Sequence, residues 1–281
     1  MSTNLISQHD ALEVMGHENV SFVDASWYLP AQNRNALAEY RSMRIPNAVF
    51  FDIDAIADQS SDLPHMLPQP EVFAKNVSVM GIRHHNLIIV YDGPGLFSAP
   101  RVWWTFKVMG ALDVRILEGG FDRWKAADLP VETGNPNPQM AKVFQPSFKP
   151  ELVASLEDME RNVVSCDATV IDARSGERFA GRAEEPRPGL RSGHIPGSKS
   201  LPFNKLIEDG KLVSNDRLEG IFKKLGIDES SPVITTCGSG VTAAILSLAL
   251  SETGRENYKL FDGSWAQWGL PDGPEIATED G

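Results

Sequence analysis

The sequence repeats itself once, and this internal repeat is the feature that most limits how the chain can fold. Four short segments of the first half recur in the second half, in the same order and at nearly one separation. The paired segments are 22–26 with 170–174, 44–48 with 194–198, 87–93 with 232–238, and 119–124 with 263–268. In a chain of 281 residues, this pattern predicts two similar domains of roughly 130 residues each.

A proline-rich stretch separates the two copies. Prolines at positions 136, 138, 146 and 150 remove backbone donors and disfavour helix. We therefore expect a linker over residues 135–150, a first domain over 1–134 and a second domain over 151–281.

Each copy alternates short, β-branched apolar runs with longer segments of helical periodicity. In the second copy, 169–171, 233–236 and 258–261 are expected to be strands, and a helix is expected from about Val241 to Thr253. Alternating strands and helices predict an α/β fold in which each domain is a mainly parallel sheet flanked by helices. Ligands of such sheets bind beyond the carboxyl ends of the strands.

One cysteine lies at such a strand end. Cys237 follows the run 233–236 and begins the sequence Cys-Gly-Ser-Gly-Val-Thr, with a helix expected directly after it. Gly238 and Gly240 permit a tight loop whose backbone N–H groups, together with the helix dipole, favour a thiolate. Cys237 is therefore the predicted nucleophile.

The second cysteine, Cys166, precedes the expected strand 169–171 without a glycine loop, so a packing or surface role is predicted for it. Two cysteines 71 positions apart support neither a disulfide framework nor a cysteine-ligated metal site. A reducing, cytoplasmic setting is therefore expected.

Other cysteine chemistries fit the loop less well. A cysteine phosphatase needs an arginine about six residues after the nucleophile to bind phosphate, and that position is Ala243. A Cys-His hydrolase needs a histidine beside the sulfur. The single histidine of the second copy, His194, lies in a Gly-His-Ile-Pro-Gly segment that is typical of a structural turn, although a role as general base stays open.

The charge balance excludes some partners. With 26 Lys and Arg against 38 Asp and Glu, the net charge is −12, so nucleic acid is an unfavourable partner. No apolar stretch approaches the roughly 20 residues of a membrane span, and the first ten residues do not read as a secretory signal. The local exception is the segment 174–194, whose five arginines suit an anionic substrate.

Together these motifs resemble the two-domain rhodanese family of sulfurtransferases. The resemblance rests on the Cys237 loop, on the Arg-Phe-Ala-Gly and Glu-Pro-Arg runs at 178–181 and 185–187, on the turn 193–197, and on Asp-Gly-Ser-Trp at 262–265. It covers nearly the whole chain. The Cys-Gly-Ser-Gly-Val loop is typical of the branch that uses 3-mercaptopyruvate, whereas thiosulfate enzymes carry Arg-Lys after the cysteine.

The resemblance implies a function and a set of site residues. The first domain is inert, in agreement with Asp92 at the position of Cys237, and the second transfers sulfur through a Cys237 persulfide. It needs no cofactor or metal, and its acceptor is cyanide or a thiol such as thioredoxin or a low-molecular-weight thiol. The implied catalytic residues are Cys237 and Ser239, and the implied substrate-binding residues are Arg178, Arg187, Gly238, Gly240, Val241 and Thr242.

Two points stay open at this stage. The family signature usually has His and Gly where this chain has Arg44 and Asn47, so a proton relay through Ser239 is not assigned. A thiosulfate:cyanide sulfurtransferase and a persulfide carrier that receives sulfur from a partner are the alternative functions. A redox sensor is disfavoured, because the loop contains no second cysteine that could resolve an oxidised one.

Overall fold

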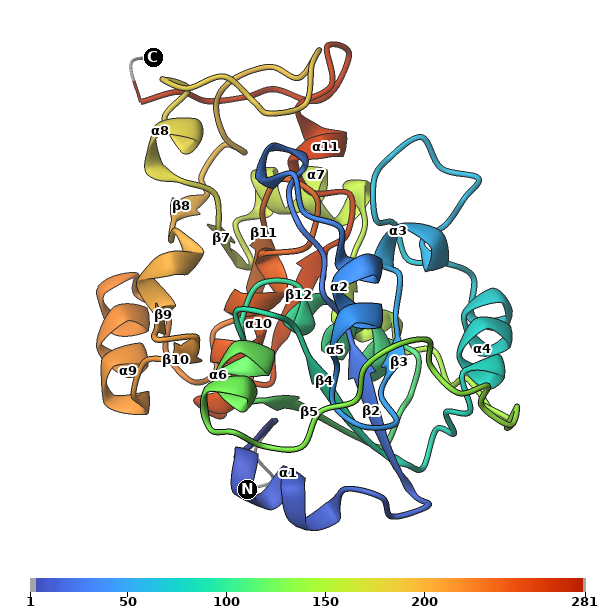
Figure 1. Ribbon diagram of the computed structural model, residues 1–281. Helices are drawn as coiled ribbons and strands as arrows, with labels where there is room; N and C mark the ends of the chain where they lie inside the picture. The colour runs from blue at the N-terminus through green and yellow to red at the C-terminus, as the bar shows by residue number, and fades with distance from the viewer. Residues whose placement is uncertain (1–3, 280–281) are drawn as a thin grey trace. The chain divides into compact units, whose positions relative to one another are not determined.

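The computed structural model describes residues 4–279, and these form two compact units (Figure 1). Unit 1 comprises the chain up to Gln59, Leu67–Lys149 and Asp209–Lys211. Unit 2 comprises Ser60–Met66, Pro150–Glu208 and the chain from Leu212 onwards. A short segment of the first half of the sequence, Ser60–Met66, therefore belongs to the second unit.

Both units contain a five-stranded sheet with the same topology. The strand order is β1-β5-β4-β2-β3 in unit 1 and β6-β12-β11-β7-β8 in unit 2, and neighbouring strands pair in parallel throughout. The strands of unit 1 are β1 (Leu5–Ile6), β2 (Val20–Asp24), β3 (Val49–Phe50), β4 (Leu87–Tyr91) and β5 (Asp113–Leu117). Those of unit 2 are β6 (Val153–Ala154), β7 (Thr169–Asp172), β8 (Lys199–Ser200), β11 (Val233–Thr236) and β12 (Tyr258–Phe261). The predicted α/β fold with two parallel sheets is confirmed.

Helices follow the strands in both units. In unit 1 they are α1 (Gln8–Val14), α2 (Ala36–Ser42), α3 (Ile53–Ile56), α4 (Pro70–Val79), α5 (Ala99–Val108) and α6 (Gly120–Ala126), with a 3-10 turn η1 (Pro30–Gln32). In unit 2 they are α7 (Leu156–Ser165), α8 (Gly176–Phe179), α9 (Asn215–Lys224), α10 (Ala243–Glu252) and α11 (Ser264–Trp268), with 3-10 turns η2 (Pro150–Leu152) and η3 (Phe203–Leu206). Strands β9 (Ile207–Glu208) and β10 (Lys211–Leu212) pair separately. Within residues 4–279, no helix has both the length and the apolar character needed to cross a bilayer.

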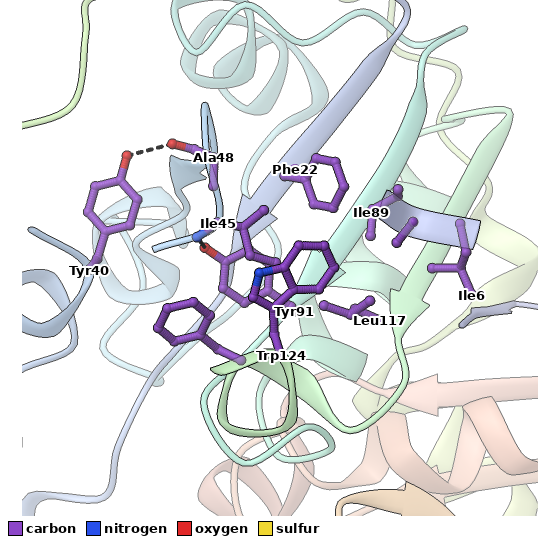
Figure 2. Packing of buried hydrophobic residues seen from close by; sticks show 11 residues of the cluster. Ile6, Phe22, Tyr40, Ile45, Ala48, Ile89, Tyr91, Leu117 and Trp124 are labelled. Carbon is purple, nitrogen blue, oxygen red and sulfur yellow. Dashed lines mark hydrogen bonds between the residues drawn. The ribbon is translucent and has the colours of Figure 1, made fainter. Parts of the chain in front are cut away.

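The core of unit 1 packs a loop of the repeat against its central strand (Figure 2). Tyr91, at the end of β4, is fully buried, and its hydroxyl accepts a hydrogen bond from the Ile45 amide at 3.4 Å. Tyr40 on α2 donates its hydroxyl to the Ala48 carbonyl at 2.7 Å. These bonds fix the segment 44–48 beside the sheet of unit 1.

The proline-rich stretch between the copies forms no helix or strand over 135–149. It lies along unit 1, where the amides of Lys142, Ser147 and Lys149 donate to backbone carbonyls at 2.8–3.0 Å. Phe144 is buried. The stretch is thus anchored to unit 1 by its backbone rather than hanging free.

The two sheets carry equivalent carboxylates at one edge, but only one of them has a cationic partner. Asp24 ends β2 and accepts the Ser26 amide at 2.9 Å, while Asp172 ends β7 and accepts the Arg174 amide at 2.9 Å. In unit 2 the Arg174 guanidinium also binds Asp172, at 2.7 Å. In unit 1 a serine stands in its place, and burial raises the pKa of Asp24 to about 6.

We expect Asp24→Asn to stabilise the protein at neutral pH. Between about pH 4 and pH 6 the folded state holds a proton that the unfolded chain has lost, so stability falls as the pH rises through this window. Above pH 6 the folded state bears the full cost of burying an ionised carboxylate. Replacing it with an amide raises the free energy of unfolding by up to about 3 kcal/mol. Urea unfolding at pH 7.5 and at pH 4 measures the difference, which should vanish at the lower pH. Equal stabilisation at both pH values would contradict the assignment to this carboxyl.

Candidate active site

Cys237 directly follows β11 at the carboxyl edge of the unit 2 sheet, and it is buried. Residues 238–242 form the loop that leads into α10. Gly240 adopts a φ of 76°, which favours glycine. Helix α10 begins at Ala243, not at about Val241 as predicted, because residues 241 and 242 still form a turn.

The start of α11 holds the backbone around Cys237. The amides of Trp265 and Ala266 donate to the carbonyls of Cys237 and Gly238, each at 2.9 Å. The Cys237 amide donates to the Ser264 hydroxyl at 3.3 Å. Ser264 has a φ of 47°, a left-handed conformation that costs a non-glycine residue free energy.

A guanidinium lies against the first residue of the loop. A Cβ atom at Gly238 would lie 3.0 Å from Arg178 Nη2, so the lack of a side chain at this position leaves room for the guanidinium beside the loop. Arg178 is held by Glu185, to which its Nε donates at 3.1 Å and its Nη2 at 2.5 Å. This places the Arg178–Glu185 ion pair beside the cysteine loop.

The other arginines of this segment have different partners. Arg174 is fully buried, binds Asp172 and Glu185, and lies over the Trp265 ring at 4.1 Å. Arg182 is exposed and pairs with acidic side chains, and Arg191 donates to backbone carbonyls of the C-terminal segment. Arg187 is partly buried and lies further along the segment than Arg178. Its binding role stays a prediction.

Ser239 contacts a histidine that the sequence did not single out. The Ser239 hydroxyl and His65 Nδ1 are 3.1 Å apart, and both residues are buried. His65 belongs to Ser60–Met66, the segment of the first half that joins unit 2. Its position between Pro64 and Pro68 in a polar loop was the available signal, but no spacing rule connects it to Ser239.

Arg44, at the position where the family signature usually has histidine, is a structural residue of unit 1. Its side chain is fully buried, forms an ion pair with Glu132 and donates to the Gly134 carbonyl at 2.6 Å. The absence of histidine at position 44 therefore does not deprive Ser239 of an imidazole partner.

His194 has a structural environment. Its ring stacks on Phe179 with centroids 3.9 Å apart, and Nδ1 donates to the Phe179 carbonyl at 2.8 Å. These contacts account for the imidazole without a role in proton transfer. Cys166 is exposed at the end of α7 and is not disulfide-bonded.

In unit 1 the loop that corresponds to the cysteine loop is occupied by a carboxylate. Asp92 follows β4 and is fully buried. Its two oxygens accept four backbone N–H groups at 2.6–2.9 Å, those of Gly95, Phe97, Ser98 and Ala99. A loop of this geometry, followed by a helix, therefore binds a negative charge.

Comparisons with known proteins agree with this geometry. The family profile described as "Rhodanese-like domain" matches residues 7–127 and 155–270. The chain is 42% identical over 271 residues to the 3-mercaptopyruvate sulfurtransferase of Escherichia coli K12, covering 96% of each chain. It is 40% identical over 283 residues to the mitochondrial thiosulfate/3-mercaptopyruvate sulfurtransferase 1 of Arabidopsis thaliana, covering 93% of this chain and 75% of the relative. The crystal structure of SseA from Escherichia coli, a 3-mercaptopyruvate sulfurtransferase, superposes with a TM-score of 0.86 at 39% identity, covering 94% of this chain and 99% of that one.

Proposed function

This chain belongs to the rhodanese family, and from that premise we propose that it is a 3-mercaptopyruvate sulfurtransferase whose nucleophile is Cys237. The single observation that carries the assignment of the site is the position of Cys237, buried at a strand end in a glycine loop that has an arginine beside it. The sequence Cys-Gly-Ser-Gly-Val places no cationic side chain within the loop itself.

The reaction transfers one sulfur atom in two steps. The Cys237 thiolate attacks the sulfur of 3-mercaptopyruvate, a sulfur–sulfur bond forms, and the carbon–sulfur electron pair leaves with the enolate of pyruvate. The enolate takes up a proton to give pyruvate, and the cysteine is left as a persulfide. A thiol, or cyanide, then removes the outer sulfur and regenerates Cys237.

The loop supplies electrostatic stabilisation. By analogy with the four amides that hold Asp92, the backbone N–H groups of residues 240 and 242–244 surround the charge on the Cys237 sulfur. Gly240 and Thr242 therefore act through their backbone, and the binding roles of Gly238 and Val241 stay predictions. The sulfur is negatively charged before attack and again as a persulfide, so these amides serve both steps.

Two groups beside the loop have separate roles. Arg178, and with it Arg187, holds the substrate carboxylate and keto oxygen and stabilises the developing enolate. The hydrogen-bonded pair of Ser239 and His65 takes the proton from the substrate thiol and passes it to the enolate.

The cysteines and the net charge support a redox compartment and a class of partner for the reaction. Cys237 and the exposed Cys166 are both unpaired, which suits a reducing cytoplasm and a thiol acceptor such as thioredoxin or a low-molecular-weight thiol. A net charge of −12 disfavours a nucleic acid partner.

Intact-mass spectrometry with 3-mercaptopyruvate as the only added reagent tests the function. We expect one added sulfur on the protein and an equivalent amount of pyruvate. Persulfide that forms only with a partner protein would instead identify a carrier, and a higher kcat/KM for thiosulfate would identify the other donor class.

We expect Arg178→Gln to lower kcat/KM for 3-mercaptopyruvate by about 10- to 100-fold, because a charged hydrogen bond to substrate and enolate is lost. Arg187→Gln is expected to act in the same direction. Steady-state kinetics measure both.

Arg182→Gln is the matched control, because Arg182 is exposed and pairs with Glu177 and Glu279. Arg174 does not serve this purpose, since its loss would leave Asp172 buried without its cation. Equal losses in the Arg178 and Arg182 variants would disprove the substrate-binding role.

A further inference from the structure

Unit 1 has a cavity of its own at the carboxyl edge of its sheet. The cavity has a volume of about 340 Å³, and Asp24, Ser26 and Gly93 contribute to its wall. Gly93 follows Asp92 as Gly238 follows Cys237. The cavity therefore occupies in unit 1 the place that the cysteine loop borders in unit 2.

The basic groups of this cavity are already neutralised. Arg34 binds Glu39 through two bonds of 2.9 and 2.6 Å and lies over the Tyr28 ring at 3.8 Å. Lys125 pairs with Asp122 at 2.9 Å. Of the three acidic side chains in the wall, Asp24 is the one left without a basic partner in the wall.

The surroundings of Asp24 differ from those of its counterpart by one cation. Ala25 and Ala173 donate to the neighbouring strand at the same distance of 2.8 Å, so the backbone is equivalent in the two units. In unit 2 the Arg174 guanidinium contacts both oxygens of Asp172, at 2.7–3.1 Å. In unit 1, Ser26 stands at the position of Arg174, and the hydrogen-bond partners of Asp24 are the neutral groups of Ser26 and Tyr91.

We propose that the unit 1 cavity binds a small organic cation, whose guanidinium or primary ammonium group pairs with Asp24 as the Arg174 guanidinium pairs with Asp172. The carboxylate of Asp24, which has no basic partner in the wall, selects for a positively charged N–H donor. An anionic 2-oxo acid would meet a surplus of negative charge there. This site is separate from sulfur transfer, which requires Cys237.

Calorimetric titration with methylguanidinium chloride tests the proposal, with sodium chloride and sodium pyruvate as reference titrants. We expect saturable binding of one methylguanidinium per chain. Asp24→Asn should weaken it about ten-fold or more, and Ser26→Arg should abolish it by supplying a tethered guanidinium. Asp122→Asn, which changes an acidic residue paired with Lys125, is the control and should retain binding.

Three results of these titrations would count against the proposal. Absence of saturable methylguanidinium binding, or equal binding by wild type and both Asp24→Asn and Ser26→Arg, would overturn the proposal. Tighter binding of pyruvate than of methylguanidinium would overturn the charge argument. Since Ser26→Arg retains Asp24, it tests the cavity independently of Asp24→Asn. Persulfide formation on Cys237 should be unchanged in all variants, so failure here is distinct from failure of the sulfurtransferase assignment.

Discussion

Cys237→Ser is expected to abolish sulfur transfer completely. A serine hydroxyl in the same loop cannot form a persulfide, and without that intermediate 3-mercaptopyruvate has no route to an acceptor. Wild type incubated with the donor should gain one sulfur atom by intact mass, and the variant should gain none. The variant should still bind the donor, because Arg178 and the loop amides are unchanged.

Cys166→Ser is the matched control, since it removes the other cysteine of the chain from an exposed helix end. Its activity should stay within a few-fold of wild type. Sulfur found on Cys166 after donor treatment, or turnover by Cys237→Ser, would refute the choice of nucleophile.

His65→Ala is expected to lower kcat by about 100-fold or more, the range typical of general acid–base catalysis. Ser239→Ala should have a similar effect, because the two side chains form one hydrogen-bonded unit. If they act together, the double variant should be hardly slower than either single variant. Steady-state kinetics of the three variants measure this coupling.

His9→Ala controls for the loss of a histidine as such, because His9 is exposed on α1 in unit 1. Fully additive losses in the double variant would show that the two side chains do not act as one catalytic unit.

The sequence was sufficient for the architecture and for placing Cys237 in a loop at a strand end, because both depend on local signals. The echo of residues 22–26 in 170–174 corresponds to β2 and β7, which lie at the same position of two identical strand orders. The glycines on either side of Ser239 specify a loop wherever they follow a buried strand. These two patterns can be read from the sequence because each depends on residues that are close together along the chain.

The partner of Ser239 could not be predicted in the same way. His65 reaches Ser239 across 174 positions, through a segment that leaves its own half of the chain to join unit 2. The roles of the arginines were equally hidden. Arg174 and Arg178 are four residues apart in one basic segment, yet one is enclosed with Asp172 and the other lies against Gly238.

The side chain of Asp92 fills the anion site of its own loop. Its two oxygens accept four amides in unit 1, so this loop leaves no amide site for a substrate anion. In unit 2 the sulfur of Cys237 stands at the equivalent position, and in the proposed reaction it carries a negative charge first as a thiolate and then as a persulfide. The unit 1 loop thus shows, with a side chain of the protein itself, how such a loop holds an anion.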